Sequence, residues 1–223
     1  SLLGDPAIAL NQPQMKIVVD SINGQAVGST PIMLKAASVA RVSGHIENAA
    51  RFDGTATAVV LDSKELVTCK ENPSAEADDP FKFYTRSKVI YSGSDSVVAG
   101  RFNLRFAVPV DLNYSSETCE MNFYAVNNDH TLTAHGYTDR FVLGGSTALT
   151  DTVGPKIFCY LNTPDFVSGD RVNTTPYFVA QIVDDDGINA TGNGVGHDMQ
   201  LIVDGKASLT YTLNDNFTYD FGS

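Results

Sequence analysis

Apolar and polar residues alternate with a period of two through much of this chain. In residues 101–108 (RFNLRFAV), every second position carries a large apolar side chain. Successive side chains of a β-strand point to opposite faces, so this run predicts a strand with one buried face. Similar runs occur at residues 40–46, 121–125, 157–161, 178–182, 199–203 and 209–213. No stretch shows a sustained helical period with capping residues, and the pattern therefore predicts an all-β protein.

Short clusters of turn-forming residues separate the alternating runs. They are Asn23-Gly24, Asp53-Gly54, residues 92–95, residues 127–129 and Asp204-Gly205. Glycine, asparagine and aspartate favour positive φ angles or local side-chain bonds that reverse the chain. Many short strands at such intervals are typical of immunoglobulin-like β-sandwiches, although the chain has no Trp for a Cys–Trp–Cys signature. Other sandwich topologies stay open.

The alternation stops at residues 144–148 and resumes at Ile157, behind Gly154-Pro155. We therefore predict a first immunoglobulin-like domain at residues 14–145, a linker at 146–153 and a second such domain at 154–223. The polar residues 71–79 (ENPSAEADD) indicate an exposed loop. The second domain is shorter than the ~100 residues typical of the class and stops in a strand-like pattern, so we expect it to be incomplete, with an open edge.

Composition and charge narrow the function classes. The net charge of −11 opposes binding to nucleic acid or to an anionic membrane surface. The sequence contains neither a transmembrane segment nor a signal-peptide pattern. Of the three cysteines, Cys159 lies in an apolar strand pattern and is interpreted as a core residue. Cys69 and Cys119 could form a disulfide across the first domain, and this possibility is left open. Because the odd total leaves at least one thiol free, the cysteines do not indicate the compartment.

We identify no catalytic residue. The candidate bases His45, His130, His135 and His197 have no local signature that pairs them with a nucleophile. Asp184, Asp186 and Asp198 offer the oxygen ligands that calcium prefers, but their spacing does not fit an EF-hand loop. An irregular calcium site is therefore a hypothesis beside the alternative of a solvated acidic turn, and no other cofactor is expected.

Several phrases of the chain resemble a known family. Residues 2–10 (LLGDPAIAL) resemble the closing segment of gingipain-like cysteine peptidase domains. Residues 18–24, 52–55, 109–115, 134–137, 154–162 and 186–198 resemble the PorU-like sortases, or signal peptidases, of the type IX secretion system of Bacteroidetes. The resemblance spans nearly the whole chain, and residues 186–198 (DGINATGNGVGHD) are its most specific part.

The resemblance implies a region downstream of a cysteine peptidase domain, with residues 1–13 as the tail of that domain. The family's peptidase removes C-terminal signals from secreted cargo and attaches the cargo to an anionic lipopolysaccharide. This chain is then a non-catalytic accessory region at the outer-membrane surface or in the periplasm. Its expected partners are the upstream peptidase domain, outer-membrane secretion components or secreted cargo. Ser21, Ser96 and Thr152 match a short O-glycosylation acceptor sequence used by many Bacteroidetes.

Two other function classes stay in competition. A cell-surface adhesin or carbohydrate-binding module would use exposed aromatic rings, and Tyr84, Tyr91, Tyr124 and Tyr137 are candidates for stacking on a sugar. Independent hydrolase activity has the weakest support, because no acid–base pair or nucleophile stands out.

Overall fold

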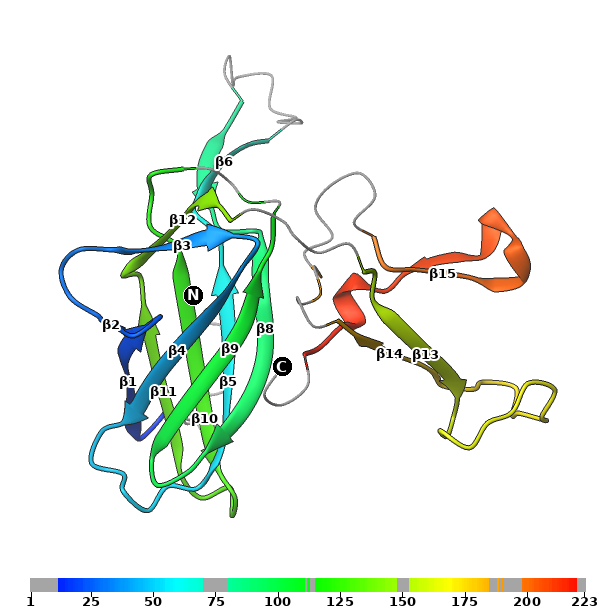
Figure 1. The fold of residues 1–223 in the computed structure, drawn as a ribbon, viewed down its shortest axis with the longest axis horizontal. Coiled ribbons are helices and arrows are strands. Elements are labelled where there is room, and N and C mark those ends of the chain that lie inside the picture. Colours follow the sequence, from blue (N-terminus) through cyan, green and yellow to red (C-terminus); the bar gives the residue numbers. More distant parts are fainter. Residues whose placement is uncertain are drawn as a thin grey trace, which may run out of the picture.

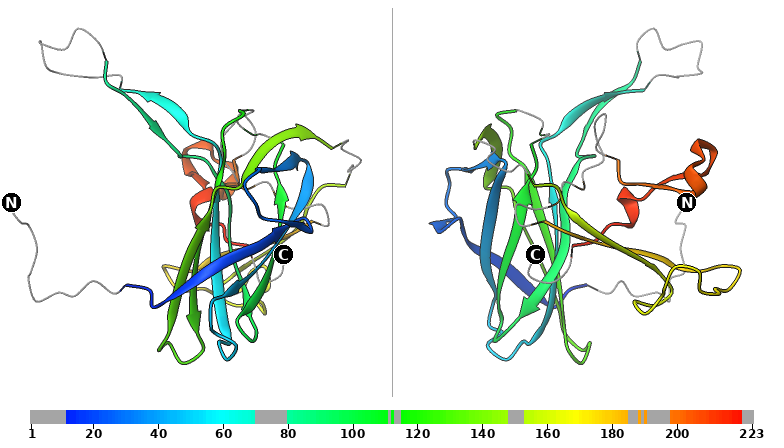
Figure 2. Two further views of the ribbon diagram at one scale, coloured as in Figure 1. Left: turned by 90° about the vertical axis from the view of Figure 1, so that its left-hand side faces the viewer. Right: turned by 45° about the vertical axis from the view of Figure 1, so that its right-hand side comes forward.

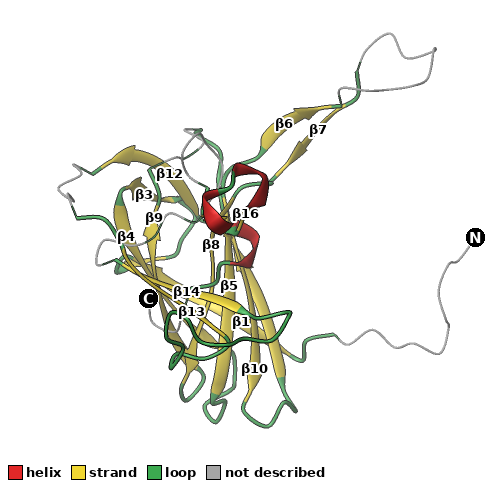
Figure 3. Ribbon diagram, turned by 90° about the vertical axis from the view of Figure 1, so that its right-hand side faces the viewer, coloured by secondary structure: helices red, strands yellow, loops and turns green. Residues whose placement is uncertain are grey.

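The structure is a computed structural model that describes residues 12–69, 80–110, 112, 115–147, 153–184, 188, 190 and 198–219. Strands and loops make up nearly all of this part, with three single-turn 3₁₀ helices, η1 (Val203–Gly205), η2 (Ala207–Leu209) and η3 (Asn214–Asn216) (Figure 3). Within it, no helix has the length and apolar character needed to cross a membrane. The predicted all-β class is confirmed, and the several sheets are consistent with β-sandwich domains.

The described residues of the first region form twelve strands, and Figure 1 shows their arrangement. They are β1 (Met15–Ile22), β2 (Gln25–Ala26), β3 (Ile32–Ala36), β4 (Ser38–Ile46), β5 (Gly54–Leu61), β6 (Glu65–Thr68), β7 (Lys82–Thr85), β8 (Val89–Val97), β9 (Arg101–Val108), β10 (Glu120–Asn127), β11 (Thr133–Thr138) and β12 (Phe141–Ser146).

The main sheet of this region folds back on itself. Its order is β8-β5-β10-β11-β1-β4-β9, and β2 pairs with β1. The β1–β11 pair is parallel, whereas the other pairs of the sheet are antiparallel. Although β8 and β9 stand at opposite ends of this order, they lie side by side, since the rings of Tyr91 and Phe106 stack with centroids 5.0 Å apart. The short parallel pair of β3 and β12 forms a separate two-stranded sheet, and its residues Ile32, Leu34 and Phe141 belong to the same core.

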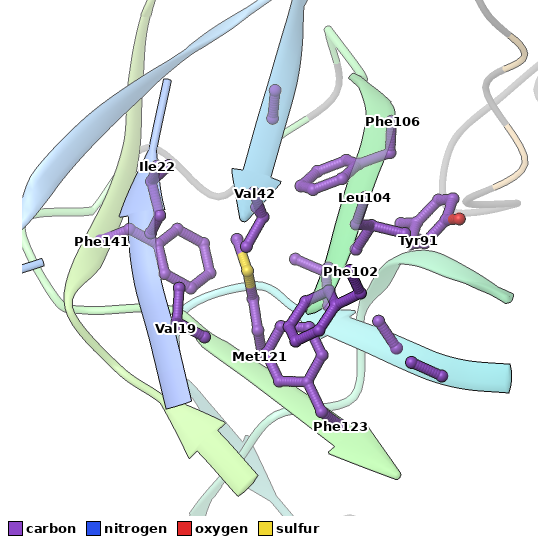
Figure 4. Packing of buried hydrophobic residues seen from close by; sticks show 14 of the residues in the cluster. Val19, Ile22, Val42, Tyr91, Phe102, Leu104, Phe106, Met121, Phe123 and Phe141 are labelled. Atoms are coloured by element: carbon purple, nitrogen blue, oxygen red, sulfur yellow. The ribbon is translucent and has the colours of Figure 1, made fainter. Parts of the chain in front are cut away.

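The core lies between the two halves of the folded sheet (Figure 4). Strand β9 follows the predicted alternation, with Phe102, Leu104, Phe106 and Val108 buried and the residues between them more exposed. The rings of Phe102 on β9 and Phe123 on β10 pack across this core, with centroids 5.4 Å apart. Period-two patterning therefore predicted correctly which face of these strands is buried.

One of the predicted turns is wrong. Residues 92–95 lie inside β8 and not between two strands. At Gly93, an added Cβ would stand 2.2 Å from the hydroxyl oxygen of Tyr91. The glycine serves close packing under an aromatic ring, and no chain reversal needs it. By contrast, Asn23 and Gly24 have positive φ angles of 51° and 76° and form the predicted turn between β1 and β2.

The described residues of the second region form two hairpins. Strands β13 (Lys156–Leu161) and β14 (Phe178–Val183) form one, and β15 (Gln200–Ile202) and β16 (Thr210–Thr212) form the other. No described side chain of residues 153–219 is buried. Cys159 is exposed, so its interpretation as a core residue is wrong, because these strands lack an opposing layer in the described chain. The boundaries proposed for the domains and the linker stay predictions.

Candidate interaction site

A two-stranded arm projects from one end of the sandwich (Figure 2). It is formed by β6 and β7, which pair antiparallel from Glu65–Thr85 to Thr68–Lys82. The arm continues the β5–β8 hairpin past a register shift between Val60 and Leu61. β5, β6, β7 and β8 therefore form one long hairpin, whose inner half belongs to the sandwich and whose outer half reaches into solvent.

Both faces of the arm carry apolar side chains. Phe81 and Phe83 are two positions apart and therefore lie on the same face, where their rings stack with centroids 5.9 Å apart. Leu66 and Tyr84 are cross-strand partners on the other face. The exposed fractions are 60% for Phe81, 51% for Leu66 and 65% for Tyr84. Since an isolated two-stranded hairpin is only marginally stable in water, the arm depends on its anchor and on anything that covers these side chains.

Arg86 anchors the arm to the sandwich. Its side chain leaves the chain between β7 and β8, and only 12% of it is exposed. One guanidinium nitrogen donates hydrogen bonds to the carbonyl oxygens of Asp62, at 2.9 Å, and of Thr118, at 2.8 Å. The Nε atom lies 3.6 Å from the carboxylate of Glu120. Arg86 thus joins the arm's base to the segment that leads into β10.

Behind Arg86 lies a buried acidic residue beside a thiol. Asp62 is fully buried, and its Oδ1 accepts a hydrogen bond of 2.7 Å from the backbone N–H of Ser63. The Sγ of Cys119 lies 3.8 Å from the same carboxylate oxygen. Burial, together with the negative field of Asp62, raises the pKa of the Cys119 thiol to about 12. A thiol with this pKa stays protonated near neutral pH and is a poor nucleophile. Cys119 therefore contributes to packing and not to nucleophilic chemistry.

Cys69 and Cys119 are both free thiols, so the disulfide that was left open does not form. Cys69 follows the outer end of β6, where its N–H bonds the carbonyl of Phe81, while Cys119 is buried at the start of β10. A disulfide needs the two Cα atoms within about 7 Å. The arm instead carries Cys69 away from the sandwich, in which Cys119 is buried.

A shallow hollow of about 560 Å³ lies at the base of the arm, lined by Lys64, Tyr84, Arg86 and residues 116–118. Its lining combines an exposed aromatic ring with two cationic side chains. The hollow and the apolar faces of the arm form one continuous candidate contact surface.

A polar cluster lies on the outer face of β1 and β4. The register shift in β1 places both Asp20 and Ser21 on this face. The Nδ1 atom of His45 lies 2.9 Å from Oδ1 of Asp20, and the hydroxyls of Ser21 and Ser43 bond at 2.6 Å. Within the described chain, the imidazole of His45 hydrogen-bonds only to Asp20, and no hydroxyl or thiol is hydrogen-bonded to it as a nucleophile would be.

The predicted calcium site and the predicted O-glycosylation sites remain untested. Asp186 and Thr152 lie outside the described residues, and in the described part no group of three or more His, Cys, Asp or Glu side chains comes together. The calcium hypothesis therefore stays a prediction. Ser96 is exposed on β8 and its N–H bonds the carboxylate of Asp95 at 2.6 Å, whereas Ser21 is half-buried.

Sequence reasoning missed the anchor. Arg86, Asp62 and Cys119 are far apart in the chain and share no motif, so only the register of the strands brings them together. A signal for the arm did exist, because the aromatic-rich sequence Phe81-Lys82-Phe83-Tyr84 follows the polar sequence 71–79 after Pro80. A strand pattern next to a polar excursion is typical of a hairpin that leaves the body of a domain.

The fold and this surface define an all-β, sandwich-type region with an apolar projecting arm and, in the described part, no assembled catalytic group. The chain is similar to the crystal structure of dimeric latent PorU from Porphyromonas gingivalis, with 35% sequence identity and a TM-score of 0.65. The match covers 97% of this chain and 21% of that one, so the chain spans about a fifth of the PorU protein. It is therefore a PorU-like region. No protein-family model and no curated protein match it.

Proposed function

We propose that this chain is a non-catalytic accessory region of a type IX secretion sortase, a cysteine peptidase of the cell surface that removes C-terminal signals from secreted cargo. The observation that carries the proposal is the 35% identity to PorU, which extends over 97% of the chain. The expectation that the parent protein lies at the outer-membrane surface or in the periplasm belongs to the same proposal.

The arm is the part of this region that we assign to contact with the peptidase domain of the same protein. Its exposed apolar side chains lie on both faces, and the hollow at its base continues that surface. Aromatic side chains surrounded by polar residues are typical centres of protein interfaces. Arg86 ties the base of the arm to the sandwich through two hydrogen bonds, and restraint of this kind lowers the entropic cost of binding.

The test uses the full-length parent protein with Phe81 and Phe83 both changed to Ser. We expect the release of the C-terminal signal from a secreted substrate to fall at least about tenfold, the loss typical of an interface aromatic pair. A matched control changes Tyr177, which is 79% exposed in the second region, to Ser and leaves the release unchanged.

Three results distinguish the parts of this proposal. Full activity of the F81S/F83S protein contradicts the role of the arm but leaves the family assignment intact. A parent gene that encodes no upstream domain with a Cys–His pair contradicts the accessory role itself. Binding of the arm to isolated cargo, with no effect on the peptidase, moves the contact from the peptidase domain to the cargo.

Glycan binding is the second candidate function, and one surface feature favours it. Tyr124 and Tyr137 lie on neighbouring strands and point to the same outer face, with exposed fractions of 46% and 69%. Tyr91 is buried and cannot stack on a sugar. A glycan array with the whole chain tests this function. Specific binding that the Y124A/Y137A variant loses supports it, and an array without specific signal removes it.

A further inference from the structure

Strand β8 has an open edge at one end of the main sheet. Among the described strands, β8 pairs along its length with β5 alone. An edge strand leaves backbone N–H and C=O groups without ladder partners and readily accepts another extended segment. In this structure, the segment Phe217-Thr218-Tyr219 of the second region lies along that edge and forms a parallel bridge between Tyr219 and Gly93 (Figure 1).

A column of aromatic rings runs from the core through this contact. Phe106 stacks on Tyr91 at 5.0 Å, Tyr91 meets Tyr219 at 4.7 Å, and Tyr219 meets Phe217 edge-on at 4.8 Å. We call these four residues the aromatic column. Since Tyr91 is 2% exposed and Tyr219 packs against the core, the column continues the core of the first region into the second.

Gly93 makes this approach possible. A Cβ at this position would lie 2.2 Å from the Tyr91 hydroxyl oxygen and 3.1 Å from the Cβ of Tyr219. Any side chain here would displace the ring of Tyr91 or push the docked segment off the edge. A glycine in the middle of an edge strand therefore shapes a shallow seat for one aromatic residue.

The docked segment is also tied to its own region. The hydroxyl of Tyr219 donates a hydrogen bond of 2.6 Å to the carbonyl oxygen of Ile188. Asn214, just before the segment, accepts from the N–H of Met199 at 2.9 Å and donates to the carbonyl of Ala190 at 3.3 Å. Tyr219 thus faces the sandwich with its ring and the second region with its hydroxyl.

We propose that the β8 edge is a strand-docking site for an extended aromatic-x-aromatic segment, that Phe217-Thr218-Tyr219 of the same chain is its occupant, and that this contact couples the second region to the sandwich. The recognition combines the backbone bridge at Gly93 with the ring contact between Tyr219 and Tyr91, while Phe217 packs edge-on against Tyr219 within the segment. Backbone pairing at a sheet edge together with side-chain contacts is the mode of β-strand addition. Because the occupant is tethered, its local concentration is about millimolar. One backbone bridge and one ring contact across the edge therefore suffice to hold it. The proposal does not depend on the proposed function.

The test measures amide hydrogen exchange of the whole chain in solution. In the Y219A variant, we expect residues 91–94 to exchange about tenfold faster, while the amides of β10 keep their protection. The matched control is Y177A, which removes a tyrosine of the second region that is 79% exposed and leaves β8 unchanged. Y219F keeps the ring, loses only the bond to Ile188, and retains most of the protection of β8.

A peptide of residues 214–221 (NDNFTYDF) supplies the decisive measurement. At millimolar concentration it restores the protection of residues 91–94 in the Y219A chain, and the same peptide with Ala in place of Tyr219 does not. Equal exchange in the wild-type and Y219A chains overturns the proposal. Protection that appears only at high protein concentration, together with a dimeric mass, also overturns it, because the segment then comes from a second copy.

Discussion

Replacing Arg86 with Met tests whether the arm is anchored as the structure indicates. The change keeps most of the apolar stem and removes the charged donor that bonds the carbonyls of Asp62 and Thr118. Loss of the guanidinium donor at each of these partly buried carbonyls costs about 1–3 kcal/mol. The carboxylate of Glu120 regains water, because 31% of its side chain is exposed, so its loss adds little. We therefore expect the free energy of unfolding to fall by about 3 kcal/mol.

Urea unfolding followed by circular dichroism measures this loss, and a fall in Tm of about 6–12 °C is the matching thermal result for a chain of this length. The control is Arg101→Met. Arg101 is 75% exposed and lies 3.9 Å from Asp20, and an exposed ion pair of this kind contributes about 0–1 kcal/mol. If R86M and R101M destabilise the protein equally, the anchor does not contribute as argued.

Three further predictions follow from burial and close packing. The two tyrosines of the aromatic column have pKa values raised to about 12 by burial, so the stability gained from their neutral form is present below pH 10 and is lost as the pH rises through 12; ultraviolet titration of the phenols should show two late-titrating groups, and titration of all tyrosines near pH 10 would contradict this. A thiol reagent at pH 8 should modify Cys159 quickly and Cys119 only after unfolding, because Cys159 is exposed while Cys119 is 1% exposed with a raised pKa; equal rates for the two thiols in the native protein would refute the burial. Gly136→Ala should destabilise the protein by about 2 kcal/mol or more in urea unfolding, because its Cβ would stand 2.2 Å from a backbone carbonyl of β1, whereas Gly144→Ala, with no atom within 4 Å, should change stability by less than about 0.5 kcal/mol; similar values for the two variants would show that β1 and β11 separate easily.

Local patterning predicted seven of the sixteen described strands, which are β4, β9, β10 and β13 to β16. The period of two in residues 101–108 and 121–125 names the buried face of β9 and β10 without any knowledge of their partners, because alternation is a property of the extended chain itself. The turn at Asn23-Gly24 was also predicted from the sequence, since its positive φ angles favour asparagine and glycine. The resemblance to PorU-like proteins likewise depended on short phrases of sequence, and the match to the PorU structure confirms it.

The tertiary structure decided what lies against each strand, and the physical reason is that contacts between distant segments leave no periodic signal. Gly93 looked like a turn residue, yet it lies in the middle of β8, where it pairs with Ala58 of β5 and a tyrosine of the second region packs on it. Cys159 looked like a core residue, yet its strand has no opposing layer in the described chain. Arg86 carries no motif at all, and its role arises only where strand register brings two carbonyl groups from separate loops to one side chain.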